Sequence, residues 1–332
     1  MNLATEYTQS YPIKPVTSTL TAADHWDHFL ARMGVKRGGH RVEPGLYALR
    51  NPNPDSPVFV TANYTLSFDA LRAALVGMDA YILVLDTKGV NVWCAAGEGT
   101  FGTDELVQRI EESCLKEVVH RRVVILPQLG APGVAAQEVK KRSGFKVEYG
   151  PVRASDLPEY MKTREATPEM RMVRFPLIDR LVLIPVELKY VLLPMLIAGL
   201  ILTLSGAPLV AGGVVTAMLA GAAFFPILLP WLPTSDFSSK GFILGGLVTL
   251  PFVLSIFLNQ PQVALWRQIA SGLALLLALP PLTAYLALNF TGATTFTSRT
   301  GVRREMYTYL PFMAWMFGIG LVLYVALIVI RA

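Results

Sequence analysis

The chain is poor in the residues that build protein metal centres, with two cysteines and four histidines among 332 residues. No Cys-x-x-C pair occurs, and the histidines have no ligand-like spacing to Cys94 or Cys114. A zinc or iron–sulfur site made by the protein itself is therefore not expected. Both cysteines fall in the polar half, which we expect to face a reducing compartment where disulfides rarely persist. A cysteine without a disulfide partner can be retained for its sulfur chemistry.

Charge is also scarce, since Asp, Glu, Lys and Arg make up only 16% of the chain. Four stretches of the second half contain no charged residue: 190–235, 241–266, 268–298 and 306–330. A helix that spans a bilayer needs ~20 mainly apolar residues. The sequence therefore predicts five transmembrane helices, near 183–205, 208–231, 241–258, 267–289 and 310–330. With almost no ionisable residue inside them, anchoring is favoured over transport.

The flanks of these spans differ in positive charge. Seven basic residues would lie on one side: Arg171, Arg174, Arg180, Lys240, Arg299, Arg303 and Arg304. Only Arg267 and Arg331 would lie on the other side. The positive-inside rule then predicts a cytoplasmic-membrane protein with a cytoplasmic N-terminal domain and an external C-terminus. No signal peptide is expected at the N-terminus, and the net charge of +5 indicates membrane topology rather than nucleic-acid binding.

The first half alternates between apolar strand patterns and helical patterns. The expected strands are 58–62, 80–85, 90–95 and 122–126, and the expected helices are 21–33, 67–76, 103–116 and 133–143. This alternation predicts an α/β fold, a Rossmann-like domain with a largely parallel sheet. The predicted organisation is an N-terminal extension (1–45), an α/β domain (46–163), a juxtamembrane linker (164–180) and an all-α, five-helix transmembrane domain (181–332).

A glycine-rich segment follows the strand expected at 90–95. Gly97, Gly99 and Gly102 match G-x-G-x-x-G, the dinucleotide-binding fingerprint, between an expected strand and an expected helix. That fingerprint also requires an acid at the end of the next strand, where this chain has Ile125-Leu126-Pro127-Gln128. Glycines that merely permit a tight turn and close helix packing are the favoured alternative.

Cys94 lies just before these glycines, at the expected carboxyl end of a strand and beside a helix start. Such surroundings favour the thiolate, the form that binds metals. The alternative is a small buried hydrophobic residue, which is the common role of a lone cysteine in an apolar strand. Cys114 is expected inside the 103–116 helix, where it would be structural. Trp93 could belong to the core or flank a flat macrocycle.

The segment Asn91-Val92-Trp93-Cys94-Ala95-Ala96-Gly97, with 99–104, resembles the cap-helix motif of the mercury-methylating corrinoid proteins, the HgcA family. Segments 58–67 and 126–133 and the overall plan extend the resemblance. The soluble segments are also similar to the corrinoid iron–sulfur proteins of the acetyl-CoA pathway, which lack the membrane part and the cap cysteine. One departure is Glu98, where the family motif usually has lysine.

The resemblance implies a cobalamin-type corrinoid whose cobalt receives Cys94 as its lower axial ligand. It implies a corrinoid-dependent methyltransferase that passes a methyl group from cobalt to Hg(II), giving methylmercury. It also implies two partners, a ferredoxin-like iron–sulfur protein (HgcB in that family) and a methyltransferase that supplies the methyl group. The implied cofactor-binding residues are Asn91, Trp93, Cys94, Ala95, Gly97, Thr61, Asn63, Thr65, Ser67, Gly130 and Gly133. The alternative is a corrinoid-binding methyl carrier or sensor without mercury activity, a divergence that Glu98 would mark.

Overall fold

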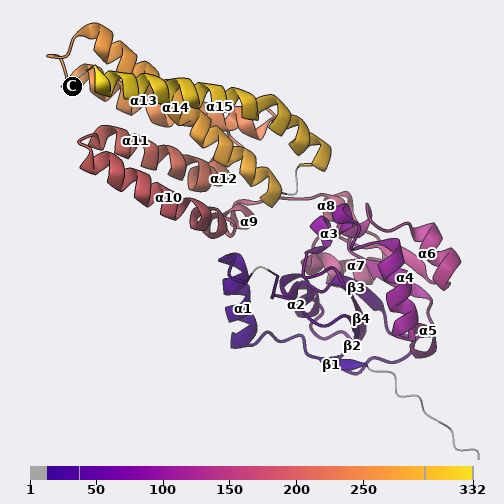
Figure 1. Ribbon diagram of the computed structural model, residues 1–332. Coiled ribbons are helices and arrows are strands. Elements are labelled where there is room, and N and C mark those ends of the chain that lie inside the picture. Colours follow the sequence, from indigo (N-terminus) through magenta and orange to yellow (C-terminus); the bar gives the residue numbers. More distant parts are fainter. Residues whose placement is uncertain (1–12, 37, 295–296, 331–332) are drawn as a thin grey trace, which may run out of the picture. The chain divides into compact units, whose positions relative to one another are not determined.

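The computed structural model describes residues 13–36, 38–294 and 297–330, and the chain divides into two compact units between Val173 and Arg174 (Figure 1). Each unit has its own packing. The first contains a sheet with helices, and the second consists of helices alone. The predicted fold class is thereby confirmed.

The sheet of the first unit has six strands in the order β1-β2-β4-β3-β5-β6. The strands are β1 (Lys14–Val16), β2 (Gly45–Leu49), β3 (Val58–Ala62), β4 (Ala80–Leu85), β5 (Val123–Leu126) and β6 (Lys146–Tyr149). All neighbouring pairs are parallel except β2 and β4. The strands predicted at 58–62 and 80–85 have the expected bounds. Strands β1, β2 and β6, which are three to five residues long, were not expected from the sequence.

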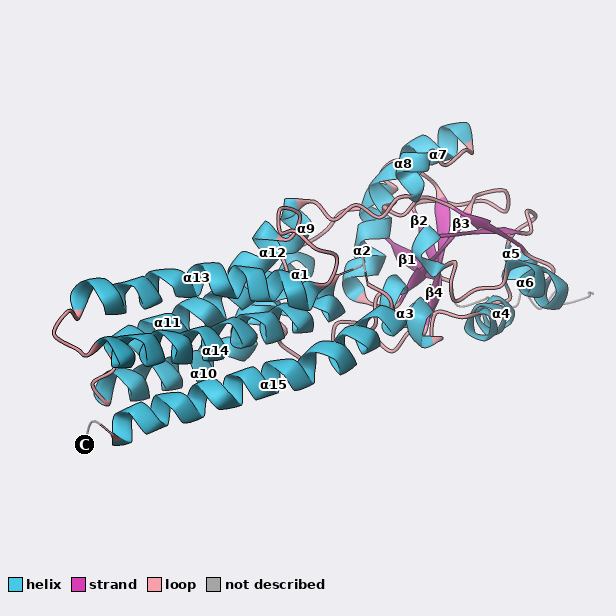
Figure 2. Cartoon of the chain, turned by 90° about the horizontal axis from the view of Figure 1, so that it is seen from above, coloured by secondary structure: helices cyan, strands magenta, loops and turns pink. Residues whose placement is uncertain are grey.

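Helices cover both faces of this sheet (Figure 2). The helical elements of this unit are α1 (Ala22–Arg32), α2 (Thr65–Ala74), α3 (Val92–Glu98), α4 (Thr103–Glu112), α5 (Leu115–Val118), η1 (Gln128–Gly130), α6 (Ala136–Ser143), η2 (Ala154–Asp156), α7 (Leu157–Thr163) and α8 (Pro168–Arg171). Side chains from α3 to α6 share one buried cluster with Val58 and Val60 of β3, whereas α2, α7 and α8 share another with Phe59. This alternation is the two-residue period of a strand buried on both faces.

Two sequence expectations about this unit are wrong. Residues 90–95 do not form a strand, because Val92 begins helix α3. A short apolar run fits a strand or a buried helix equally well. Here the side chain of Asn91 caps the first turn and stabilises the helix. The helix expected over 103–116 also breaks, because Cys114 has a left-handed φ of 49° between α4 and α5. Cys114 therefore lies in a turn rather than inside a helix.

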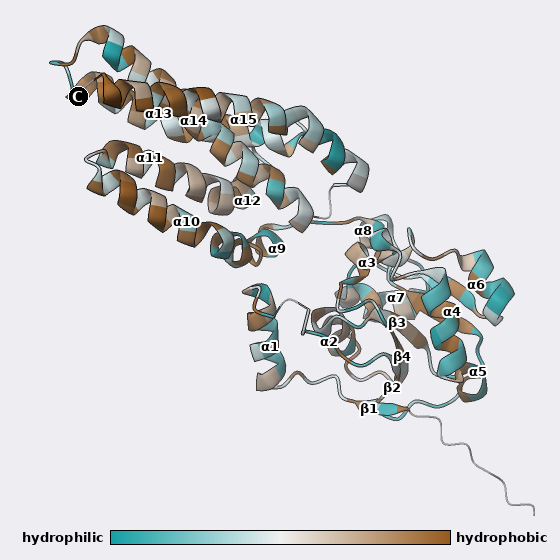
Figure 3. Cartoon of the chain, viewed as in Figure 1, coloured by the Kyte–Doolittle hydropathy of each residue, from teal (hydrophilic) through white to brown (hydrophobic). Residues whose placement is uncertain are grey.

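The second unit contains α9 (Leu177–Leu181), α10 (Ile184–Leu204), α11 (Pro208–Leu219), the π-helix η3 (Ala220–Phe224), α12 (Phe225–Leu228), α13 (Phe237–Asn259), α14 (Leu265–Asn289), η4 (Phe290–Ala293) and α15 (Arg299–Val329). Among the described residues, five helical stretches are long and apolar enough to cross a membrane, as predicted. These helices consist largely of hydrophobic residues (Figure 3), and many of their large hydrophobic side chains are exposed. Such an exterior suits contact with lipid.

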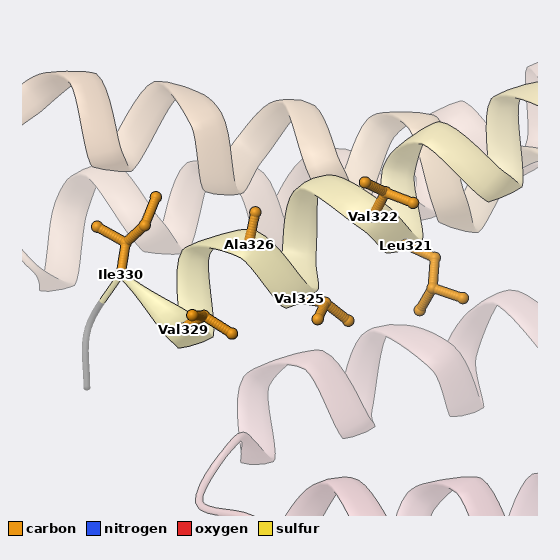
Figure 4. A pocket seen from close by; sticks show the side chains of 6 residues that line it. All are labelled: Leu321, Val322, Val325, Ala326, Val329 and Ile330. Atoms are coloured by element: carbon orange, nitrogen blue, oxygen red, sulfur yellow. The ribbon is translucent and has the colours of Figure 1, made fainter.

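Small residues let the central helices of this unit pack closely. A Cβ atom on Gly245 would lie 2.7 Å from the Cα of Pro280, and one on Gly320 would lie 2.8 Å from the backbone nitrogen of Ala278. Close backbone approach of this kind drives helix association inside membranes. A shallow hollow beside the end of α15 is lined only by aliphatic side chains (Figure 4): Leu321, Val322, Val325, Ala326, Val329 and Ile330. It offers no side-chain polar group to a substrate.

Candidate corrinoid site

The candidate site lies at the carboxyl edge of the parallel strands. Strand β3 pairs with β4 on one side and with β5 on the other, so the chain crosses over β3 between β4 and β5. Ligands of open α/β sheets bind at such a reversal of strand order, beyond the carboxyl ends of the strands. Here the segments that follow β3, β4 and β5 are 63–64, 86–91 and 127–135. The implied site residues come mainly from these segments and from the starts of α2 and α3.

Helix α3 presents the candidate cysteine. The side chain of Asn91 caps the helix by accepting a hydrogen bond from the backbone N–H of Cys94, with an N···O distance of 3.0 Å. Gly99 ends the helix in a left-handed conformation with a φ of 89°. Val92, Ala95 and Ala96 are buried and fix the helix against the sheet core. Their i, i+3, i+4 spacing defines one face of the helix.

Cys94 belongs to another face of α3, which is open to solvent. Asn91 and Glu98 are exposed, Cys94 is partly buried, and the three lie at i, i+3 and i+7. Cys94 is therefore not a fully buried core residue. Full burial would be expected if it had the common role of a lone cysteine in an apolar segment. Trp93 is also partly buried. The acidic departure from the motif, Glu98, lies one helical turn beyond Cys94 on this face.

The glycine-rich segment is explained by local packing. Gly97 lies inside α3, Gly99 ends that helix and Gly102 caps α4. Because a helix rather than a strand precedes these glycines, the context required by the dinucleotide fingerprint is missing. A Cβ atom on Gly102 would lie 2.7 Å from the carbonyl oxygen of Gly99, so the turn requires glycine there.

Gly130 and Gly133 place the segment after β5 against the α3–α4 segment. A Cβ atom on Gly130 would lie 2.5 Å from the ring of Phe101, and one on Gly133 would overlap the carbonyl oxygen of Phe101 and lie 3.0 Å from the Cα of Ala96. The backbone N–H of Thr103 donates to the carbonyl oxygen of Gly133, at 3.2 Å. The structure thus brings the two glycines next to α3, and their lack of a side chain permits this contact.

A hydroxyl group from β6 supports the same segment. The Tyr149 hydroxyl donates a hydrogen bond to the carbonyl oxygen of Val134, at 2.5 Å. Burial raises the pKa of Tyr149, which keeps the phenol protonated as a donor. Residues 133–135 are therefore fixed from the sheet as well as from α4.

Asn63, directly after β3, is buried and organises the segment between β4 and α3. Its side-chain oxygen accepts hydrogen bonds from the Thr87 backbone N–H at 3.1 Å, the Thr87 hydroxyl at 2.9 Å and the Gly89 backbone N–H at 2.9 Å. Its side-chain nitrogen donates to Asp86 at 3.1 Å. The Asn63 amide is thus occupied by protein groups, which suits a role in positioning the turn before the Cys94 helix.

The remaining predicted residues lie near the same strand. Thr61 is buried within β3, three per cent exposed, whereas Thr65 and Ser67 are partly buried in the first turn of α2. The backbone N–H of Thr65 donates to the carbonyl oxygen of His40. These hydroxyl-bearing residues therefore differ in access, and Thr65 and Ser67 are more open to a ligand than Thr61.

Sequence reasoning missed three residues that shape this edge. They are Asp86 and Thr87, in the segment before α3, and Glu105 of α4. The Glu105 carboxylate accepts a hydrogen bond from the Asp86 backbone N–H at 2.8 Å and also forms an ion pair with Arg109 at 2.8 Å. Thr87 is completely buried. Asp86 and Thr87 directly follow an unbroken apolar strand, and that position could have identified them.

Residues 36–161 match the family of the CO dehydrogenase/acetyl-CoA synthase delta subunit. Among similar curated proteins are the acetyl-CoA decarbonylase/synthase complex subunits gamma of Methanopyrus kandleri, 33% identical over 128 residues, and of Methanothermobacter thermautotrophicus, 34% identical over 122 residues. The corrinoid/iron-sulfur protein large subunit of Moorella thermoacetica is 28% identical over 129 residues. This segment is therefore similar to that family and to the corrinoid/iron-sulfur protein large subunit.

The similarity to these relatives is partial, and the residues of the family match lie within the first unit of the chain. It covers 38%, 36% and 38% of this chain and 27%, 26% and 28% of the three relatives, in the same order. The chain thus spans about a quarter of the length of the curated relatives it matches. The five apolar helices lie outside the matched residues.

Proposed function

We propose that this protein is a membrane-anchored, corrinoid-dependent methyltransferase that delivers a methyl group to Hg(II). The observation that carries the proposal is the partly exposed Cys94 on α3, at the carboxyl edge of a domain homologous to corrinoid iron–sulfur proteins. The five apolar helices would anchor the domain, with the N-terminal unit cytoplasmic and the C-terminus outside. Cys94 would hold the cofactor by binding its cobalt through the thiolate sulfur.

The residues present suit a corrinoid. Cys94 supplies a sulfur ligand on a short helix that is capped at both ends, and the packing of Gly133 against α3 leaves Cys94 on a different face from the buried one. The buried hydroxyl oxygen of Thr100 has no hydrogen-bond partner within the described structure. A polar group of this kind is available to a ligand such as the amide-bearing rim of a corrinoid. Thr65 and Ser67 add two further hydroxyls near this edge.

A bound corrinoid would supply the cobalt that carries the methyl group. The role of Cys94 follows from its chemistry, because a thiolate ligand donates electron density to its metal, as it does in haem enzymes. Such donation favours departure of a group with its bonding electrons, and Hg(II), an electrophile, accepts a group in that form. Asn91 would orient the sulfur by capping α3, and Asn63 would fix the turn before it.

The proposal is tested with full-length protein produced with cobalamin and purified in detergent. We expect a corrinoid absorption spectrum, and methylmercury on incubation with a methyl donor, a reduced ferredoxin-like iron–sulfur partner and Hg(II). Cys94→Ala should change the spectrum and abolish methylmercury formation, whereas the control Cys114→Ala should preserve both. Normal mercury methylation by Cys94→Ala would refute the assignment.

A second candidate function, a corrinoid methyl carrier or sensor without mercury activity, is favoured by Glu98. A carboxylate one turn from Cys94 adds negative charge near the sulfur and can change which partner docks there. The discriminating experiment incubates protein loaded with methylcobalamin with Hg(II) and follows loss of the methyl group. Loss that depends on Cys94 supports the methyltransferase, and retention of the methyl group supports the carrier.

A further inference from the structure

Helix α1 is attached to the first unit by polar contacts rather than by apolar burial. None of its residues is buried. Asp24 pairs with Arg72 of α2 at 2.8 Å, and His28 contacts Asp69 of α2 at 2.7 Å. Asp27 contacts His40, with an N···O distance of 2.7 Å. Both acids of α1 are thus turned toward the protein.

The outward side of α1 presents exposed apolar side chains. The rings of Trp26 and Phe29 are stacked with their centroids 5.3 Å apart, and these residues are 60% and 50% exposed. Large hydrophobic residues exposed in the described part of the first unit number five, and three of them lie within 26–35: Trp26, Phe29 and Val35. Since soluble surfaces rarely concentrate apolar groups in this way, this cluster marks an interaction site.

Basic residues follow the aromatic pair. Arg32, Lys36 and Arg41 are all exposed at the end of α1 and in the segment after it. The outward side therefore combines an indole, a phenyl ring and several cations, while the acids of the helix point inward. Aromatic rings at headgroup depth, accompanied by Lys and Arg, are typical of helices that lie in a membrane interface.

We propose that α1 docks on an anionic lipid surface through Trp26, Phe29, Arg32 and Lys36. The inference relies on the membrane anchoring included in the proposed function. The membrane is within reach, because the first unit ends at Val173 and the first apolar helical stretch begins at Leu177. Positive charge on the helix is complementary to anionic headgroups. Docking would hold the corrinoid domain against the membrane, because α1 is bonded to α2.

The test uses the full chain in nanodiscs made with phosphatidylglycerol and with lipids brominated near the headgroup. The fluorescence of Trp26 is obtained as the difference between the wild type and Trp26→Phe, a variant that retains all the ion pairs of α1. We expect the bromolipid to quench this difference signal and aqueous iodide to have little effect. The matched control is Val76→Trp in the Trp26→Phe background, which places an indole at an exposed position just beyond the end of α2. Its fluorescence should be quenched by iodide and not by bromolipid.

The charge dependence gives a second measurement. Arg32→Gln and Lys36→Gln should each lower the ratio of docked to undocked Trp26 by about fivefold, and discs of zwitterionic phosphatidylcholine, which have no net charge, should lower it further. Trp26 quenched by iodide but not by bromolipid would overturn the proposal. Trp26 shielded from both would also overturn it, in favour of α1 packing on the protein's own helices. The corrinoid spectrum of the same samples tests the proposed function separately.

Discussion

Reversing the charge of Glu98 should make the Cys94 sulfur more reactive. The two residues lie at i and i+4 on α3, and Cβ atoms at that spacing are ≈5–6 Å apart. A carboxylate at this distance disfavours the thiolate, and a lysine ammonium favours it. Glu98→Lys should therefore increase the thiolate fraction of Cys94 at neutral pH. Glu98→Gln should change the free energy of deprotonation by half as much.

The magnitude follows from Coulomb's law. One unit charge about 6 Å from another in water contributes about 0.7 kcal/mol, which is about a threefold change in an equilibrium constant. The use of the value for water is justified because Glu98 is exposed. Glu98→Gln should thus raise the thiolate-to-thiol ratio about threefold, and Glu98→Lys about tenfold.

The assay is the rate of iodoacetamide alkylation as a function of pH, in a Cys114→Ser background so that Cys94 alone reacts. We expect the alkylation profile to move to lower pH in Glu98→Gln and further in Glu98→Lys, and the differences to shrink in high salt. Equal profiles for these two variants and the parent with Glu98 would refute the reasoning, because they would show that the charge at this position does not act on the sulfur.

Three further predictions concern packing and pH. Asn91→Ala removes the cap of α3 and should cost about 1 kcal/mol, seen as faster amide hydrogen exchange in α3, whereas Asn91→Ser should largely retain protection. Gly133→Ala forces a Cβ atom onto the Phe101 carbonyl and should destabilise the first unit by about 1–3 kcal/mol in thermal unfolding, whereas a Cβ at Gly97 meets open space and should be tolerated. Burial lowers the pKa of His40, but hydrogen bonds to the Val35 carbonyl and Asp27 outweigh this effect and raise it above 6.5. Protonated His40 should therefore stabilise the attachment of α1 fully below pH 6.5, with loss as the pH rises through the folded-state pKa, and hydrogen exchange in α1 should lose this pH dependence in His40→Gln.

Long, strongly patterned segments of this chain were predictable from sequence. The apolar strands β3 and β4 and the five long apolar helices follow from uninterrupted apolar runs, short and bounded by turn residues for the strands and about 20 residues long for the helices. Short edge strands were not predictable. β1 has three residues, and β6 contains Lys146 and Glu148, whose charges hide its pattern. Pairing with neighbours distant in sequence determines such strands.

The sequence indicated candidate site residues but not the local structure in which they lie. The sequence indicated Cys94 as the reactive residue and placed it on a strand, whereas it lies in the first turn of a helix. Asn91 was the available signal, because Asn is a favoured N-cap residue. The interior partners of Asn63 could not be read from sequence, since residues 86–89 reach it only through the pairing of β3 with β4.

Helix α3 has seven residues, and a helix of that length is not stable in water by itself. Its position therefore depends on contacts elsewhere: the Asn91 cap, the burial of Val92 and Ala95, and the close approach of Gly133. Each of these contacts fixes the backbone of the helix that carries Cys94. A substitution at Gly133 should consequently alter the reactivity of Cys94 through its position, whereas Glu98 alters it through charge. Salt distinguishes the two effects, because ions screen the field of Glu98 and leave the packing at Gly133 unchanged.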